Sequence, residues 1–81
     1  MSYTHATLFH AKVASGQGHK ELLIAKTPEG RHFLMGNSLP KSLGMLGNAH
    51  IYSGKFHTLS ENELSTIKIM PGVTTPIVLA S

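Results

Sequence analysis

The sequence contains no cysteine, which removes two common means of stabilising a short chain. Disulfides are excluded, and so are the commonest structural zinc sites, because both depend on cysteine sulfur. The 81 residues form one small domain, residues 1–81. A core of this size contributes only about 3–5 kcal/mol of net stability. We therefore expect the chain to act as a homo-oligomer or to dock on a larger protein assembly.

Charged side chains are also scarce. They make up 14% of the chain, and all four acidic residues are glutamate. A neutral polar surface tolerates contact with another protein, because the centres of protein interfaces are depleted in charge. This composition favours a non-enzymatic protein-interaction or structural module. Viral accessory proteins, such as inhibitors and capsid-decorating proteins, share this size and neutrality.

Long apolar runs and leader segments are absent as well. No run approaches the roughly 20 apolar residues of a membrane-spanning helix, and no signal-peptide pattern opens the chain. We expect no membrane association and a cytoplasmic location, which includes incorporation into a virion made in the cell. The seven basic residues are spread singly and give a net charge of +3, so they predict no concentrated nucleic-acid patch.

Strand-forming sequence is abundant by contrast. Branched and aromatic residues recur at strand spacing, and clusters of Gly, Pro and Ser separate the segments. The first three predicted strands form a meander over residues 6–14, 19–27 and 31–36. Later strands are predicted over residues 49–59 with a bend at Ser53-Gly54, over 65–70, and over 73–80 after a turn at Pro71-Gly72. The second and third strands have centres that are apolar on both faces, so we expect cover on both sides of them.

The stretch GNSLPKSLGMLGN, residues 36–48, connects the third strand to the next one. It lacks the second glycine of the phosphate-binding pattern G-x-x-x-x-G-K-[ST], so it predicts no phosphate loop. Ser38 is a suitable N-cap, and Leu39, Leu43 and Leu46 fall on one helical face. The predicted fold is therefore mainly β, a small barrel or compact sandwich of about six strands with one short helix in the 38–46 connection. A capping box at residues 60–63 predicts one further helical turn.

Histidine is the residue type that most invites a metal hypothesis. The six histidines match no metal-binding spacing, and neither cysteine nor aspartate is available to complete a coordination shell. Convergence of three histidines from different strands is the alternative that sequence leaves open. No nucleophile elbow and no dinucleotide-binding loop is present. We therefore predict no catalytic residue, no metal, no cofactor and no enzymatic activity.

The segment HIYSGKFH, residues 50–57, is the best candidate for contact with nucleic acid. In a continuous strand Tyr52 and Phe56 share one face, and Lys55 lies beside them. Platforms that stack single-stranded bases combine aromatic and basic residues in this way. With Arg31, these residues define the alternative function, a small-barrel single-stranded nucleic-acid-binding protein. The competing interpretation is that Tyr52 and Phe56 are core aromatics.

The C-terminal segment has no charged side chain from Ile69 to Ser81. Pro76 cannot donate a hydrogen bond to a neighbouring strand, which predicts an edge strand. Uncharged edge strands tend to recruit another chain. We therefore expect a subunit or partner interface at Val73, Thr75, Ile77 and Leu79. Pairing of this strand with the first strand of the same chain is the alternative.

Overall fold

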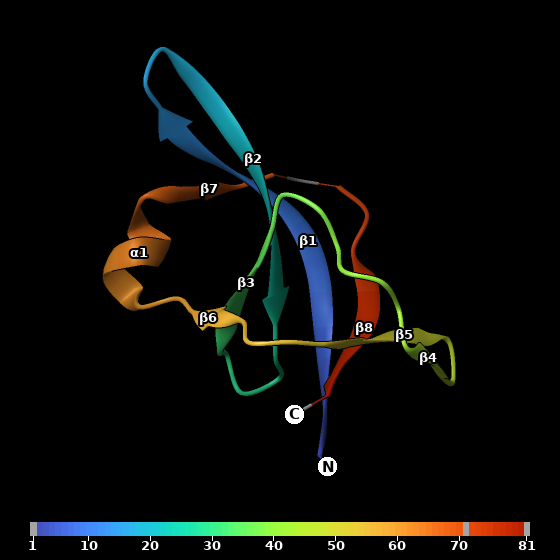
Figure 1. The fold of residues 1–81 in the computed structure, drawn as a ribbon. Coiled ribbons are helices and arrows are strands. Elements are labelled where there is room, and N and C mark those ends of the chain that lie inside the picture. Colours follow the sequence, from blue (N-terminus) through green and yellow to red (C-terminus); the bar gives the residue numbers. More distant parts are fainter. Residues whose placement is uncertain (1, 71, 81) are drawn as a thin grey trace.

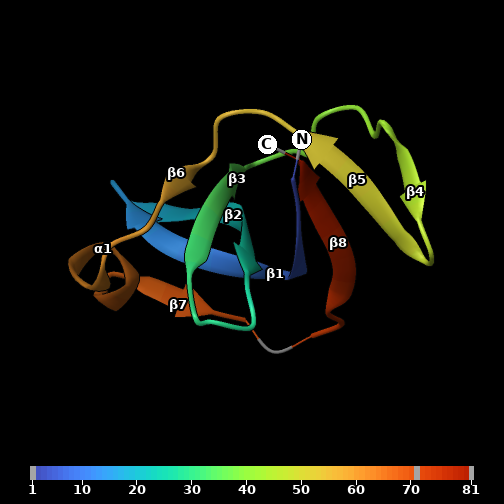
Figure 2. The same cartoon turned by 90° about the horizontal axis from the view of Figure 1, so that it is seen from below.

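The computed structural model describes residues 2–70 and 72–80. These residues form eight strands and one helix: β1 (Tyr3–Ser15), β2 (Gly18–Lys26), β3 (His32–Gly36), β4 (Gly44–Leu46), β5 (Ala49–Ser53), β6 (His57–Thr58), α1 (Glu61–Ser65), β7 (Ile67–Ile69) and β8 (Thr75–Ala80). The strands belong to one curved sheet with the order β4-β5-β8-β1-β2-β3-β6, and β7 pairs with β1 (Figures 1 and 2). The predicted mainly β fold is confirmed. The sheet has eight strands rather than about six because β4 and β6 are additional short strands, and it does not close into a barrel.

The meander of the first three strands forms as the sequence predicts. β1 pairs antiparallel with β2 from Thr7 with Lys26 to Ser15 with Gly18. β2 then pairs antiparallel with β3. The turn between β2 and β3 contains Gly30 at φ 93°, a backbone conformation that side chains disfavour and glycine accepts. The outer half of the β1–β2 hairpin projects from the body of the molecule (Figure 1).

The core consists of two hydrophobic clusters that draw on alternate residues of β1. One cluster contains Ala6 and Leu8, and the other contains Phe9 and Ala11. Because alternate residues of a strand point to opposite faces, the two clusters lie on opposite faces of the meander. Strands β5 and β8 supply most of the partners in the first cluster, and the segment from Leu59 to Ile67 supplies those in the second. The predicted cover on both sides of β2 and β3 is thus confirmed.

The predicted helix over residues 38–46 is wrong, and the segment ends in strand β4. Gly44 has φ 145°, which no helical residue adopts. The Ser42 hydroxyl accepts a hydrogen bond from the Gly44 N–H at 3.2 Å and donates one to the Gly44 carbonyl at 2.9 Å. These side-chain hydrogen bonds take the place of the backbone hydrogen bonds that Gly44 would make in a helix. Gly47 at φ 63° opens a two-residue hairpin turn to β5 instead of ending a helix.

The prediction that the C-terminal segment is an edge strand is also wrong. β8 pairs antiparallel with β1 on one side and parallel with β5 on the other. Pairing with β5 begins at Ile77, one residue after Pro76, so the missing N–H of the proline lies outside that ladder. The alternative, pairing with the first strand of the same chain, is the arrangement observed. The predicted turn at Pro71-Gly72 includes Pro71, which lies outside the described residues.

Helix α1 confirms the predicted capping box. The Ser60 hydroxyl accepts a hydrogen bond from the Glu63 N–H at 3.2 Å, and the Glu63 carboxylate accepts one from the Ser60 N–H at 3.1 Å. The other oxygen of this carboxylate lies 2.8 Å from His57 Nε2, which ties α1 to β6. In the described part of the chain no helix is long and apolar enough to cross a membrane.

We expect the stability of the domain to fall in acid partly through Glu63. The hydrogen bond from the Ser60 backbone, with a further one from His57, holds the pKa of the Glu63 carboxyl below its ordinary value. A carboxyl whose folded pKa is lowered stabilises the fold above its unfolded pKa of about 4.3 and loses this contribution as pH falls through the folded pKa. Glu63→Gln should therefore flatten the free energy of unfolding, measured with denaturant, between about pH 6 and pH 3. Glu61→Gln is the control, because Glu61 makes neither contact, and equal pH profiles for wild type and Glu63→Gln would contradict the prediction.

Candidate nucleic-acid interface

The structure brings three of the four sequence-selected nucleic-acid residues to one cavity. Arg31 comes from the β2–β3 turn, while Lys55 and Phe56 come from the connection between β5 and β6. The cavity measures about 400 Å³, and Phe33 of β3 completes its aromatic lining. Its remaining walls are formed by small or apolar residues: Thr4, Gly54, Leu79 and Ala80. We call the site formed by Arg31, Phe33, Lys55 and Phe56 the cationic groove.

A rigid turn positions Arg31. Thr27 is only 2% exposed, and its hydroxyl accepts a hydrogen bond from the Arg31 N–H at 3.1 Å. The Thr27 N–H donates to the Arg31 carbonyl at 2.9 Å, so the two residues close the turn from both directions. The Arg31 guanidinium carbon lies 5.7 Å from the centre of the Phe33 ring, within the range of a cation–π contact. This contact orients the cation at the wall of the groove.

An interruption of the strand after β5 positions Lys55 and Phe56. Gly54 has φ 155°, a conformation that ordinary side chains seldom adopt, and strand pairing resumes only at His57. A Cβ atom at Gly54 would lie 3.5 Å from the Phe56 ring, so the ring packs closely over this glycine. The predicted bend at Ser53-Gly54 is confirmed, and it carries Lys55 and Phe56 away from the line of β5.

Tyr52 takes a different role from the one that a continuous strand predicts. Strand β5 ends at Ser53, so Tyr52 and Phe56 do not share one strand face. Tyr52 is 7% exposed and belongs to the core cluster that contains Ile77 and Leu79. The interpretation of Tyr52 as a core aromatic is thus confirmed. Phe56 is half-buried, because one side of it packs against this cluster.

Phe33 is the groove residue that the sequence analysis did not select. It stands two residues after Arg31, and positions two apart on a strand share a face. The pairing of a cation with an aromatic ring at this spacing is the signal that could have identified it. In the structure Phe33 is half-buried, packs against the first cluster and lines the groove.

The groove is positively charged at its walls. Arg31 and Lys55 line it, and among the described residues no Asp or Glu side chain does. The nearest acid in the sequence to Arg31 is Glu29, whose pKa is lowered by a hydrogen bond from its own backbone N–H, by the Thr27 hydroxyl and by the charge of Arg31. Glu29 therefore offsets part of the Arg31 charge.

The four predicted interface residues of the C-terminal segment are distributed between core and surface. Ile77 and Leu79 are buried in the chain's own core, at 1% and 7% exposure. Thr75 is exposed at the start of β8, and Val73 lies before the strand with 86% of its surface exposed. Only Thr75 and Val73 are thus available to a partner of the folded chain.

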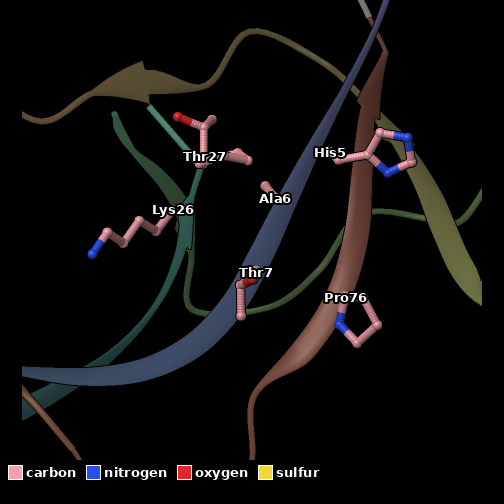
Figure 3. Close-up of a pocket in the computed structure, with 7 residues that line it drawn as sticks. His5, Ala6, Thr7, Lys26, Thr27 and Pro76 are labelled. Carbon is pink, nitrogen blue, oxygen red and sulfur yellow. The ribbon is translucent and has the colours of Figure 1, made fainter. Parts of the chain in front are cut away.

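Another cavity, of about 480 Å³, lies between the ends of β1, β2 and β8. Figure 3 shows that its two basic side chains do not converge, because Lys26 and His5 extend away from each other on opposite sides of β1. Thr27, which also lines this cavity, uses its hydroxyl to hold the Arg31 turn. Size alone therefore does not make this cavity the functional site.

The histidines make individual contacts with the structure around them. His57 bonds Glu63, His50 Nδ1 lies 3.1 Å from the Ser42 hydroxyl oxygen, and His32 meets the edge of the Phe9 ring. Over residues 2–70 and 72–80, no group of three or more potential ligand side chains is arranged to hold a metal ion.

The arrangement of the cationic groove suits the binding of a ligand that carries both negative charge and flat rings. Its guanidinium and ammonium groups can hold phosphate oxygens, and its phenyl rings can stack on a planar group. No protein-family model, curated protein or solved structure matches the chain. The chemistry of the groove itself is therefore the ground for a functional proposal.

We expect Tyr52→Ala to unfold or strongly destabilise the domain. Removal of a large buried aromatic side chain leaves a cavity and costs about 3–5 kcal/mol, which is comparable to the whole stability of a domain of this size. Tyr52→Phe keeps the ring and is the matched control. Denaturant unfolding followed by circular dichroism measures both, and a Tyr52→Ala protein with wild-type stability would contradict the core assignment.

Proposed function

We propose that the chain is a non-enzymatic protein that binds single-stranded nucleic acid in the cationic groove. The observation that carries this proposal is the convergence of Arg31, Lys55 and two phenylalanines from separate segments on one cavity that no glutamate side chain lines. A net charge of +3 assists the approach of a polyanion.

The cations and the rings contribute different parts of the binding energy. Arg31 and Lys55 neutralise backbone phosphates, which makes affinity depend on salt and not on sequence. Stacking of a base on an aromatic side chain contributes about 1–3 kcal/mol for each base and tolerates all four bases. The groove therefore favours a nucleic acid of any sequence whose bases are free to leave their own stack.

A neighbouring cavity favours a strand over a single nucleotide. It measures about 470 Å³ and shares Gly54, Lys55 and Phe56 with the cationic groove. Phe56 thus lines both cavities, so successive nucleotides of one strand can occupy the two cavities next to it. A duplex keeps its base faces stacked inside the helix and offers none to Phe56 or Phe33.

We expect Phe56→Leu to weaken the binding of a short oligothymidine or oligouridine by about 1–3 kcal/mol, because the leucine keeps the packing but not the aromatic face on which a base stacks.

Lys55→Gln should reduce the slope of log affinity against log salt concentration by about 0.7, the contribution of one phosphate contact on a single strand. Fluorescence anisotropy with a labelled oligonucleotide at several salt concentrations measures both effects.

Lys41→Gln is the matched control for Lys55→Gln. Lys41 is exposed in the connection before β4 and lines neither cavity, so its loss removes the same charge without a groove contact. Wild-type affinity and salt slope in folded Phe56→Leu and Lys55→Gln would refute the proposal. So would an equal loss in Lys41→Gln, because this would show that only net charge matters.

A second candidate function is protein interaction, which the composition favours, and the β4–β5 hairpin supports it. β4 stands at one end of the sheet order and pairs only with β5 among the described strands (Figure 2). Leu43, Met45 and Leu46 are exposed there, and no Lys, Arg, Asp or Glu occurs from residue 42 to residue 54. In monomeric proteins, charged side chains on an edge strand normally prevent it from pairing with another chain. We propose that β4 pairs with β4 of a second copy, which joins two sheets about a two-fold axis.

We expect Met45→Lys to abolish self-association, because a charged side chain at the centre of β4 would oppose pairing with a second copy. Sedimentation velocity over a wide range of protein concentration measures the change, with Lys41→Met as the control for altered composition outside the strand. A wild-type mass that stays monomeric over that range, or a dimer that survives Met45→Lys, would exclude this interface.

A further inference from the structure

Two lysines face each other across neighbouring strands at the base of the β1–β2 hairpin. Lys12 of β1 is directly paired with Lys68 of β7. Like charges at directly opposite positions of an antiparallel pair destabilise the sheet. On its other side Lys12 is opposite Glu21 of β2, yet the one ion pair in the described part of the chain joins His57 to Glu63. The repulsion between the two lysines is therefore not relieved by a bonded carboxylate.

The packing of β7 keeps the two lysines together. The neighbouring pairs in the ladder are Ala11 with Ile69 and Val13 with Ile67. Ala11 is fully buried and Ile67 packs against the second core cluster. This register therefore turns Ala11 of β1 and Ile67 of β7 toward the same cluster. A slip of one residue would turn the lysines toward the core, which the cost of burying charge forbids. The same alternation that turns Ile67 toward this cluster places both lysines on the opposite face.

A cavity of about 300 Å³ lies at this pair of lysines. It is lined by Lys12, Lys68, Met70 and His19, where His19 comes from β2 near the hairpin tip. The Met70 N–H donates to the His10 carbonyl at 3.0 Å, which fixes the end of β7 against β1. Glu21 does not line the cavity, and the cavity shares no residue with the cationic groove.

We infer that Lys12, Lys68 and His19 form a binding site for a phosphate group. Lys12 and Lys68 occupy directly paired backbone positions, and with the His19 ring they supply donors around one cavity to a tetrahedral oxyanion. A bound phosphate lies between the lysines and replaces their repulsion with attraction. The group can belong to a small phosphate compound or to the backbone of a nucleic acid, since both present the same oxygens.

Thermal unfolding in inorganic phosphate tests this site. Chloride at equal ionic strength is the reference, because it screens charge without occupying the cavity. The melting temperature of the wild type should rise saturably with phosphate, as for any ligand that binds only the folded state. Lys68→Thr should lose this response, and it should melt higher than the wild type in chloride because the repulsion is gone.

Lys20→Thr is the matched control. Lys20 lies on the same hairpin, opposite Val13, and therefore projects from the other face of the strand pair. It should keep the full response to phosphate. Equal phosphate responses in wild type, Lys68→Thr and Lys20→Thr would overturn the site, because they would reflect a general salt effect. Absence of any phosphate response in the wild type would overturn it as well.

Oligonucleotide binding then separates the two sources of the phosphate group. If Lys68→Thr weakens the oligonucleotide and lowers the salt slope by about 0.7, the site holds a backbone phosphate. If it loses the phosphate response but binds the oligonucleotide like the wild type, the site serves a small phosphate compound. Phe56→Leu, which tests the cationic groove, should leave the phosphate response intact, so failure of one proposal is distinguishable from failure of the other.

Discussion

The structure depends on a change in which face of β1 is buried. The first half of this strand buries Ala6 and Leu8 with β8 and β5, and the second half buries Phe9 and Ala11 with β7 and the helical segment. One flat sheet cannot cover both faces of its own centre, so β5 and β8 cover one face of the meander while the segment from Leu59 to Ile67 covers the other. In a chain without disulfides, these two clusters contain most of the buried apolar residues that the structure describes.

Both candidate binding sites follow from this arrangement. The β5–β6 connection has to cross from the strands that cover one face to the segment that covers the other, and it passes the Gly36 end of β3 on the way (Figure 2). That crossing brings Lys55 and Phe56 to Arg31 and Phe33. The lysine pair arises on the other half of β1, where Ile67 of β7 packs against the second cluster and the next residue, Lys68, lies on the opposite face.

Sequence reasoning succeeds here where one residue type determines local geometry. Gly30 in its turn and the Ser60–Glu63 capping box are of this kind, because the partner groups lie within a few residues. It fails over residues 38–46, where the leucine spacing suits a helix and the conformation of Gly44 decides otherwise. It also fails at β8, since the pairing of β8 with β5 depends on how distant strands pack. For the same reason Arg31, Lys55 and Phe56 can be selected as residue types, while their shared cavity and the role of Phe33 require the fold.

The pairing of Tyr3 with Ala80 has a consequence for the kinetics of folding. β1 lies between β2, its neighbour in sequence, and β8, which is separated from it by almost the whole chain. Contacts between such distant segments require the closure of a long loop before they contribute any stability, and proteins rich in them fold in milliseconds to seconds instead of microseconds. During synthesis the β1–β2–β3 meander can form early, but the cluster around Ala6 and Leu8 stays incomplete until β8 has left the ribosome. In that interval the meander exposes one apolar face, so the nascent chain is most prone to aggregate just before its last strand arrives.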